Sequence, residues 1–290
     1  MTTSTPLVAG DAGRARYTYR LRVSSTARAA LLAEWDRCRW IWNECVAKSQ
    51  QVHLHNRVHP GDKRTCGPAQ LDKMLTEARQ ITPWLRAGSS VPQQQIIRDF
   101  GRSRAKALKD IAERLPVRRR AGMPRFKNKD LVHPSLNYTR RGFGIKDGRL
   151  HLAGGIVPTV VWSRDLPGEP SSVRVYRDSL GHWYCSFVVP AQVQPLPETG
   201  RVIGIDWGVT QTATATSDDH DLPHPEYGKK AQARLGRYDK MMARRKPAKG
   251  QPGSQGYRQA KKLRAKQYKK GRPPAGGHRP QVGQTRRARP

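Results

Sequence analysis

The stretch Tyr17-Thr18-Tyr19-Arg20-Leu21-Arg22-Val23 runs directly into a helix and decides the fold class. It is rich in strand-forming residues, and its alternation places one set of side chains on a single face: Tyr17, Tyr19, Leu21 and Val23. Ser24, Ser25 and Thr26 can then cap a helix. Residues spaced four and three positions apart follow as one apolar helix face: Leu31, Trp35, Cys38, Trp42 and Cys45. A strand followed at once by a long amphipathic helix predicts a mixed, α+β fold.

Further elements follow along the chain. A shorter helix is predicted over 69–80, and a long one starts at Ser89-Ser90-Val91-Pro92 and ends at Pro116. The apolar stripe predicted for that long helix consists of Ile97, Phe100, Ala107, Leu108, Ile111 and Leu115. Beyond it, Asp147-Gly148 is a hairpin signal between 143–146 and 149–153. An apolar run over 157–162 and alternating strands near 173–175 and 183–189 complete a small barrel or sandwich.

Composition indicates a polyanionic partner. The 290 residues carry 55 Lys+Arg against 22 Asp+Glu, a formal net charge of +33. Such a charge opposes compaction unless a polyanion neutralises it, and nucleic acid does so with release of counterions. An anionic membrane surface is the rival partner, but no stretch approaches the roughly 20 apolar residues of a spanning helix. Residues 1–13 carry no secretory signal, and the four cysteines include no C-x-x-C pair. We therefore expect a reduced, cytoplasmic protein with no zinc site.

Candidate nucleic-acid contacts are cations that lie off the apolar faces. Val117 to Lys129 is a basic loop around the single aromatic residue Phe126, and the chain from Lys229 onward is helical in character and extremely basic. A charge run is usually a solvated surface, but here acids are almost absent. The predicted contacts are Arg39, Arg98, Arg102, Arg118, Arg119, Arg120, Arg125, Lys127, Lys229, Lys230, Arg244, Arg245, Lys261 and Lys262.

Two segments offer possible metal ligands. Residues 53–68 are predicted to form a polar loop, whose His53, His55, His59 and Cys66 are either solvated or metal ligands, although their spacing matches no common zinc pattern. The second segment is Val202-Ile203-Gly204-Ile205-Asp206-Trp207-Gly208, a short apolar strand that ends in an acid. A carboxylate at the end of a buried strand suits Mg²⁺, as in two-metal nucleases. The alternative is an aspartate that only caps a turn after the strand.

Four segments resemble the OrfB/TnpB family of insertion-sequence proteins, which are RNA-guided relatives of type V CRISPR nucleases. The first is Arg16–Arg22 with the helix segment Cys38-Arg39-Trp40-Ile41-Trp42-Asn43. The others are Ser90-Val91-Pro92-Gln93-Gln94, then Gly122-Met123-Pro124-Arg125-Phe126-Lys127, and finally Ile203 to Thr216, which is similar to the first RuvC motif. They occur in the family's order between about Arg16 and Lys270.

The resemblance implies a domain organisation. A wedge-type β-barrel would have its first strand at 16–24, an inserted helical recognition region at 25–120 and its remaining strands at 121–198. A partial RNase H-like (RuvC) nuclease domain would occupy 199–270. Separately from the resemblance, the composition of 271–290, rich in Gly, Pro, Arg and Gln with no periodicity, predicts a disordered basic tail, and the N-terminus (1–15) is expected to be disordered as well. Asp206 would be the first of three catalytic carboxylates and a Mg²⁺ ligand, in a transposon-encoded endonuclease that acts with guide RNA, DNA and a partner transposase in DNA recombination.

The chain also departs from the family. After Lys270 the periodic helix gives way to Gly271-Arg272-Pro273-Pro274-Ala275, where the family continues to a second acid, a zinc ribbon and a third acid. Asp218, Asp219, Asp221 and Glu226 are weak substitutes, because the strand after Asp206 would carry them away. We expect a truncated or frameshifted copy that binds RNA and DNA but is nuclease-deficient. The alternatives are an active RNA-guided DNA endonuclease completed by a partner chain or by recoding, and a non-enzymatic basic protein of the nucleoid or ribosome type.

Overall fold

The computed structural model describes residues 13–191, 204–208, 211–216, 221–223, 227–248 and 251–271. The chain divides into two compact units, Met1–Gln192 and Val193–Pro290, and each is described by itself. Residues 190–199 are rich in Pro and Gln, a composition that predicts a linker, and they lie almost wholly outside the described residues. Arg14, expected in a disordered terminus, begins the first strand.

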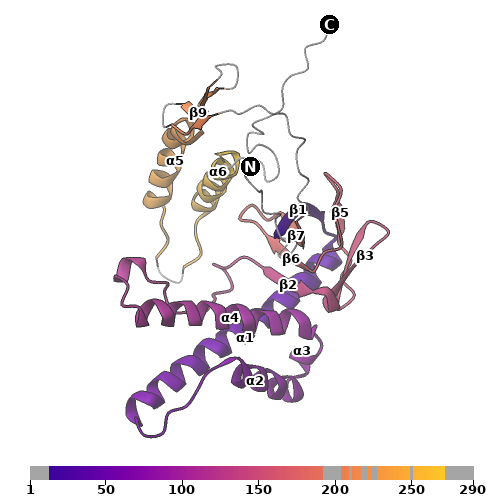
Figure 1. Ribbon diagram of the computed structural model, residues 1–290, viewed down its shortest axis with the longest axis vertical. Helices are drawn as coiled ribbons and strands as arrows, with labels where there is room; N and C mark the ends of the chain where they lie inside the picture. The colour runs from indigo at the N-terminus through magenta and orange to yellow at the C-terminus, as the bar shows by residue number, and fades with distance from the viewer. Residues whose placement is uncertain are drawn as a thin grey trace, which may run out of the picture. The chain divides into compact units, whose positions relative to one another are not determined.

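The helices of the first unit are α1 (Ser25–Val58), α2 (Pro68–Ile81), α3 (Pro83–Arg86) and α4 (Ser90–Ala112) (Figure 1). Serine side chains cap the two long helices. The Ser24 hydroxyl accepts from the Ala27 amide at 3.1 Å, and the Ser89 hydroxyl accepts from the Val91 amide at 3.3 Å. Both caps satisfy amides that the first turn of a helix leaves without a partner, so both predicted helix starts are confirmed.

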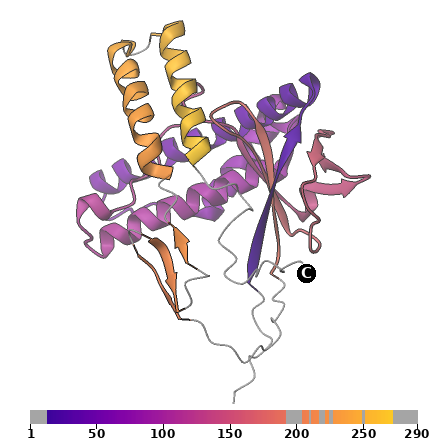
Figure 2. The same cartoon turned by 90° about the horizontal axis from the view of Figure 1, so that it is seen from above.

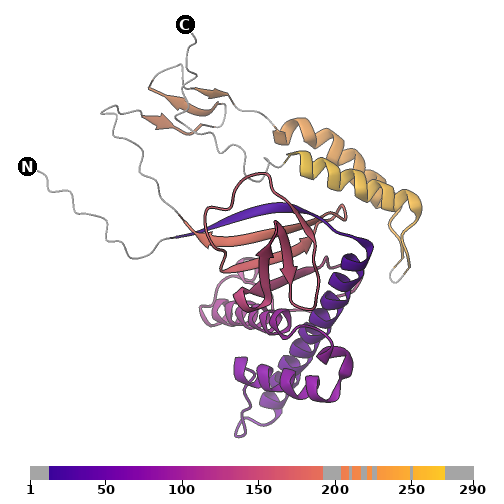
Figure 3. The same cartoon turned by 90° about the vertical axis from the view of Figure 1, so that its right-hand side faces the viewer.

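The strands of this unit form one seven-stranded antiparallel sheet in the order β2-β6-β7-β1-β5-β4-β3. Strand β1 (Arg14–Arg22) is long and twisted, and it lies between β7 (Trp183–Pro190) and β5 (Thr159–Val161) (Figures 2 and 3). The remaining strands are β2 (Ser135–Thr139), β3 (Phe143–Lys146), β4 (Arg149–Leu152) and β6 (Ser172–Arg177). The sheet is barrel-like, and the expected hairpin at Asp147-Gly148 joins β3 to β4.

Helices and sheet share one apolar core. The predicted face of α1 is buried throughout, from Leu31 to Cys45, and so are Val173, Cys185 and Phe187 of the sheet. Tyr19 of β1 is 1% exposed and packs edge-on against the Trp162 ring at 4.8 Å between centroids. The alternation of strand residues and the helical spacing of α1 therefore predicted the inward faces of the sheet and of this helix correctly.

The structure corrects three helix predictions. Helix α1 continues to Val58, so His53 and His55 lie on a helix rather than in a loop. Helix α4 ends at Ala112, before Pro116. Leu108 and Ile111 are 41% and 45% exposed instead of buried, because the buried side of α4 at this end carries Ala107 and Asp110, which are 0% and 8% exposed. Leu115, predicted on the same stripe, lies beyond the helix and is half-buried. The inward face of α4 is formed by Ile96, Ile97, Phe100 and Ala107.

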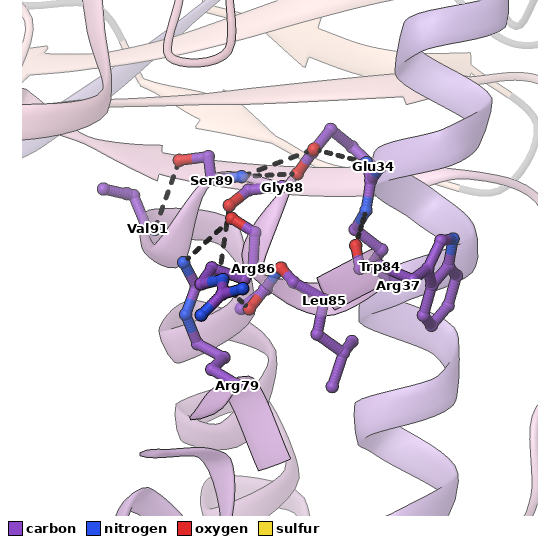
Figure 4. A network of polar contacts seen from close by, with 10 residues as sticks. Glu34, Arg37, Arg79, Trp84, Leu85, Arg86, Gly88, Ser89 and Val91 are labelled. Atoms are coloured by element: carbon purple, nitrogen blue, oxygen red, sulfur yellow. Dashed lines mark hydrogen bonds and ion pairs between the residues drawn. The ribbon is translucent and has the colours of Figure 1, made fainter. Parts of the chain in front are cut away.

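A buried polar network fixes the start of α4 against α1 (Figure 4). The Glu34 carboxylate, in a residue that is 3% exposed, accepts from the Ser89 amide at 3.3 Å and from the Arg37 guanidinium at 2.7 Å. Burial raises the pKa of Glu34, although Arg37 opposes this effect. The buried amide of Gln93, from the second segment of the resemblance, donates to the Leu85 carbonyl at 2.9 Å. This segment therefore has a structural role in the helical region.

The second unit has a small antiparallel sheet in the order β10-β9-β8 and a helical pair. Its strands are β8 (Ile205–Asp206), β9 (Gln211–Ala215) and β10 (Leu222–Pro223). Helices α5 (Tyr227–Arg244) and α6 (Gln255–Gly271) pack against each other through the buried Ala260.

Candidate nucleic-acid interface

The loop around Phe126 is fixed to helix α1. The Trp42 indole N–H donates to the Arg125 carbonyl at 2.8 Å. The Asn43 side chain clamps the backbone of Lys127, accepting from its amide at 2.7 Å and donating to its carbonyl at 3.3 Å. Two segments of the family resemblance, eighty residues apart in sequence, thus form one structural unit.

Lys127 does not reach out to phosphate as predicted. Its ammonium lies 3.6 Å from the ring centroid of Trp42 and 5.3 Å from that of Trp35. Burial lowers the pKa of Lys127 to about 8, which Asp99 partly offsets. An ammonium over two indole faces is stabilised by their π electrons. Lys127 is therefore a structural cation, and the basic loop presents one contact fewer than its sequence suggests.

The other predicted cations of the first unit fall into two groups. Some are engaged: Arg39 pairs with Asp36 at 3.4 Å, Arg102 pairs with Asp99, and the Arg120 Nε donates to the Leu115 carbonyl at 2.5 Å. Arg39 is half-buried, so its prediction as a phosphate contact is not favoured by this geometry. The remaining cations, Arg98, Arg118, Arg119 and Arg125, are exposed and can meet a polyanion, and the Arg102 side chain is also 75% exposed despite its ion pair.

Strand β1 carries a row of arginines that are not among the contacts predicted from the sequence. Four arginines opposite its buried face are exposed, Arg14, Arg16, Arg20 and Arg22, and the half-buried Thr18 lies between them. The register places Val188, Ser186 and Tyr184 of β7 beside this row, and none of them is acidic. Tyr184 stacks on Tyr176 of β6 at 5.6 Å between centroids. The same period-two alternation that identified the buried face would have revealed this basic, partly aromatic face.

The α5–α6 pair is a second basic surface. Its exposed cations are Arg234, Arg237, Lys240, Arg244, Arg245, Lys246, Arg258, Lys261, Lys262, Lys266, Lys269 and Lys270. Its one described acid, Asp239, already pairs with Arg264 at 2.5 Å. The predicted residues Arg244, Lys261 and Lys262 are exposed, and Arg245 also donates to the Gly256 carbonyl at 3.2 Å. Lys229 and Lys230 lie on α5, but their side chains are outside the described residues.

Asp206 is less enclosed than its sequence suggests. It lies in the two-residue strand β8, opposite Thr214 of β9, and is exposed rather than at the end of a buried strand. Asp221 is occupied, since its carboxylate accepts from the Ala215 amide at 2.7 Å, and Asp218, Asp219 and Glu226 lie outside the described residues. Within the described part of the chain, no three or more His, Cys, Asp or Glu side chains come together as metal ligands. The described carboxylates therefore do not fit a two-magnesium centre.

The histidines near the end of α1 have protein partners. The His55 Nε2 lies 2.9 Å from the Asp62 carbonyl and 3.2 Å from its carboxylate. Because both partners only accept, this nitrogen carries the proton. The His55 ring also stacks on His59 at 4.6 Å between centroids. These contacts favour the alternative in which the histidines are not metal ligands. Cys66, the other candidate ligand of this segment, is buried.

No described helix is both long enough and apolar enough to span a lipid bilayer.

The sequence is similar to a curated bacterial protein. A protein of Streptomyces pristinaespiralis named "Putative RNA-guided DNA endonuclease" is 27% identical over 234 residues, which cover 79% of this chain. The chain spans about half the length of that relative, 54%. No protein-family model matches the sequence. A solved structure of a Cas12f1–sgRNA–target DNA complex aligns with 78% of this chain and 62% of its own, at 11% identity and a TM-score of 0.36, too weak a likeness to carry an argument.

Proposed function

Because this chain is an OrfB/TnpB-like sequence, related to a named RNA-guided DNA endonuclease, we propose that it binds a guide RNA and DNA. The observation that carries the proposal is the row of exposed arginines on β1, which meets no acid on the adjoining strand β7. Arg14 and Arg16, and likewise Arg20 and Arg22, are two residues and so about 6.6 Å apart along the strand, which is about twice the rise of about 3.4 Å per phosphate of one strand along a duplex axis. A nucleic-acid backbone could therefore follow this strand.

The salt dependence of binding tests this proposal. Each phosphate contact contributes about −0.9 to the slope of log K against log salt concentration. The double variant Arg16→Gln/Arg20→Gln should flatten the slope of the protein by about 1.8. Lys73→Gln is the matched control, because this exposed lysine already faces Glu77 at 4.0 Å. A slope that changes equally in the control, or in neither variant, would exclude β1 as the contact surface.

We further propose that these 290 residues bind nucleic acid without cutting it efficiently. Asp206 is exposed, and the neighbouring described acids Asp221 and Asp239 are held by other partners. One carboxylate cannot position two Mg²⁺ ions roughly 3.5–4 Å apart for cleavage. The test is incubation of the chain with its co-purified RNA, matching DNA and Mg²⁺. Cleavage that disappears in Asp206→Ala would refute this part of the proposal and establish Asp206 as catalytic.

RNA bound in cells separates guided from generic binding. A guide-dependent protein should co-purify with one discrete RNA, whereas a non-enzymatic basic protein should carry a random mixture. Sequencing of the RNA that remains after a high-salt wash distinguishes the two. A random mixture would be compatible with salt-dependent nucleic-acid binding but would refute the binding of a guide RNA.

A further inference from the structure

Phe126 is a large aromatic side chain that the protein leaves in solvent. It is 55% exposed, whereas Trp42 and Phe100, in the core beneath its loop, are 8% and 1% exposed. Single exposed apolar residues are common on protein surfaces and need no explanation by themselves. Phe126 differs because the backbone on both sides of it is held in place.

Residues of the core hold the backbone on both sides of Phe126. Trp42 packs edge-on against Phe100 at 5.5 Å between centroids, and its indole N–H holds the carbonyl of Arg125. On the other side, Asn43 makes two hydrogen bonds to the backbone of Lys127, whose ammonium is inserted over the indoles. Phe126 is therefore carried by a backbone with little freedom left to lose on binding. Such pre-organisation reduces the entropic cost of an interaction.

The charges around Phe126 fit a polyanion. Arg125, directly before it, is exposed, while Lys127, directly after it, is turned inward. Arg118 and Arg119 are exposed earlier in the same basic segment. An aromatic face flanked by guanidinium groups is the combination by which proteins hold single-stranded nucleic acid, with the rings stacking on bases and the cations meeting phosphates.

We propose that Phe126 stacks on an unpaired base of a nucleic-acid single strand. This inference rests on the proposed nucleic-acid binding and adds a preference for unpaired bases to it. In a duplex the bases are already stacked on one another, so a protruding ring gains nothing there. The ring would not discriminate RNA from DNA, since every base offers a π face.

The test measures binding to three labelled probes: a single-stranded RNA of about 12 nucleotides, the DNA of the same sequence, and its duplex. In Phe126→Leu, which keeps an apolar side chain without the ring, affinity for the single strands should fall about 5- to 150-fold, the loss of one stacked base. Duplex affinity should stay within about twofold. Phe126→Trp should bind like the unaltered protein, and Val117→Ala is the control, because Val117 is 81% exposed and has no ring.

The outcomes separate this inference from the function beneath it. If the unaltered protein binds none of the probes, nucleic-acid binding itself fails, and stacking with it. If it binds but Phe126→Leu loses no single-strand affinity, or loses duplex affinity equally, the stacking role is wrong while the binding function stands. Unequal losses for the RNA and DNA single strands would contradict the expectation that the ring stacks on bases of both. Thermal melting of each variant checks that the fold is intact, as expected for a side chain outside the core.

Discussion

Replacing Asn43 by alanine should release the loop around Phe126 without disturbing the rest of the first unit. The substitution removes the two hydrogen bonds to Lys127, of 2.7 and 3.3 Å. Each such bond contributes about 1 kcal/mol net, so the free energy of opening this loop should fall by about 2 kcal/mol. Since 1.4 kcal/mol corresponds to a factor of ten, the open population should rise about 30-fold.

Limited proteolysis measures this opening directly. Trypsin cuts after lysine and arginine, and the segment offers it Arg118, Arg119, Arg120, Arg125, Lys127 and Lys129. When opening is fast relative to cleavage, the cutting rate follows the open population. Asn43→Ala should therefore be cut in this segment about 30-fold faster than the unaltered protein, as seen from the masses of the first fragments.

The chain supplies a reciprocal control. Asn56, also on α1, clamps the backbone of Arg64 with bonds of 2.9 and 2.8 Å and so fixes the loop before α2. Asn56→Ala should accelerate cutting after Lys63 and Arg64 and leave the segment 118–129 protected. If both variants are cut faster in both loops, each substitution acts through global unfolding and the local clamp is refuted. An unchanged rate in Asn43→Ala would mean that the Trp42 bond alone holds the loop.

Three further predictions follow from buried groups. Tryptophan fluorescence should titrate with a midpoint near pH 8 and should not do so in Lys127→Met, because the ammonium lies against Trp42. The native state releases this proton at a lower pH than the unfolded chain, so the contribution of Lys127 to the free energy of unfolding rises as pH rises from about 8 towards 10.5. Urea unfolding of the unaltered protein and of Lys127→Met across this pH range measures the effect. Glu34→Ala should cost about 3–5 kcal/mol in urea unfolding, because Arg37 and the Ser89 amide lose a buried acceptor, whereas Glu34→Gln keeps an acceptor and should cost less. A thiol reagent at pH 8 should modify no cysteine before denaturant is added, since burial raises the pKa of every thiol, and rapid labelling would contradict the buried positions of Cys38, Cys45, Cys66 and Cys185.

The helices and strands with a clear local periodicity could be predicted from the sequence, but the residues at which the helices end could not. The helical spacing from Leu31 to Cys45 identified a face that is buried along its whole length. The same reasoning failed at Leu108 and Ile111, because the buried side of α4 there includes a charged residue, Asp110, whose carboxylate accepts from the Ala121 amide at 2.6 Å. It also ended α1 too early at His53, since a polar helix end shows no apolar stripe.

Whether a predicted cation is exposed, paired or buried depends largely on contacts between residues that are far apart in the sequence. The pairing of Arg102 with Asp99, three residues earlier on one helix, could be read from the sequence. The insertion of Lys127 over Trp35 and Trp42 could not, because the partners are more than eighty positions away. Asp206 illustrates the opposite difficulty. Its sequence surroundings predict a buried strand end, yet the strand formed has two residues and leaves the side chain exposed.

The basic loop and the tryptophan-rich helix α1 form one structural unit, in which Trp42 contacts the loop directly. In sequence, Trp42 reads as a core residue and the segment 118–129 as a charge run, and neither predicts a specific surface. In the fold, Trp42 uses its ring to hold the Lys127 ammonium and its N–H to hold the Arg125 carbonyl. The burial of Lys127 removes one positive charge from the surface of the loop. It also fixes the backbone that carries Arg125 and Phe126. Burying the ammonium has a desolvation cost, which the indole faces of Trp35 and Trp42 offset, and the same contacts hold the backbone that carries Arg125 and Phe126 in one conformation.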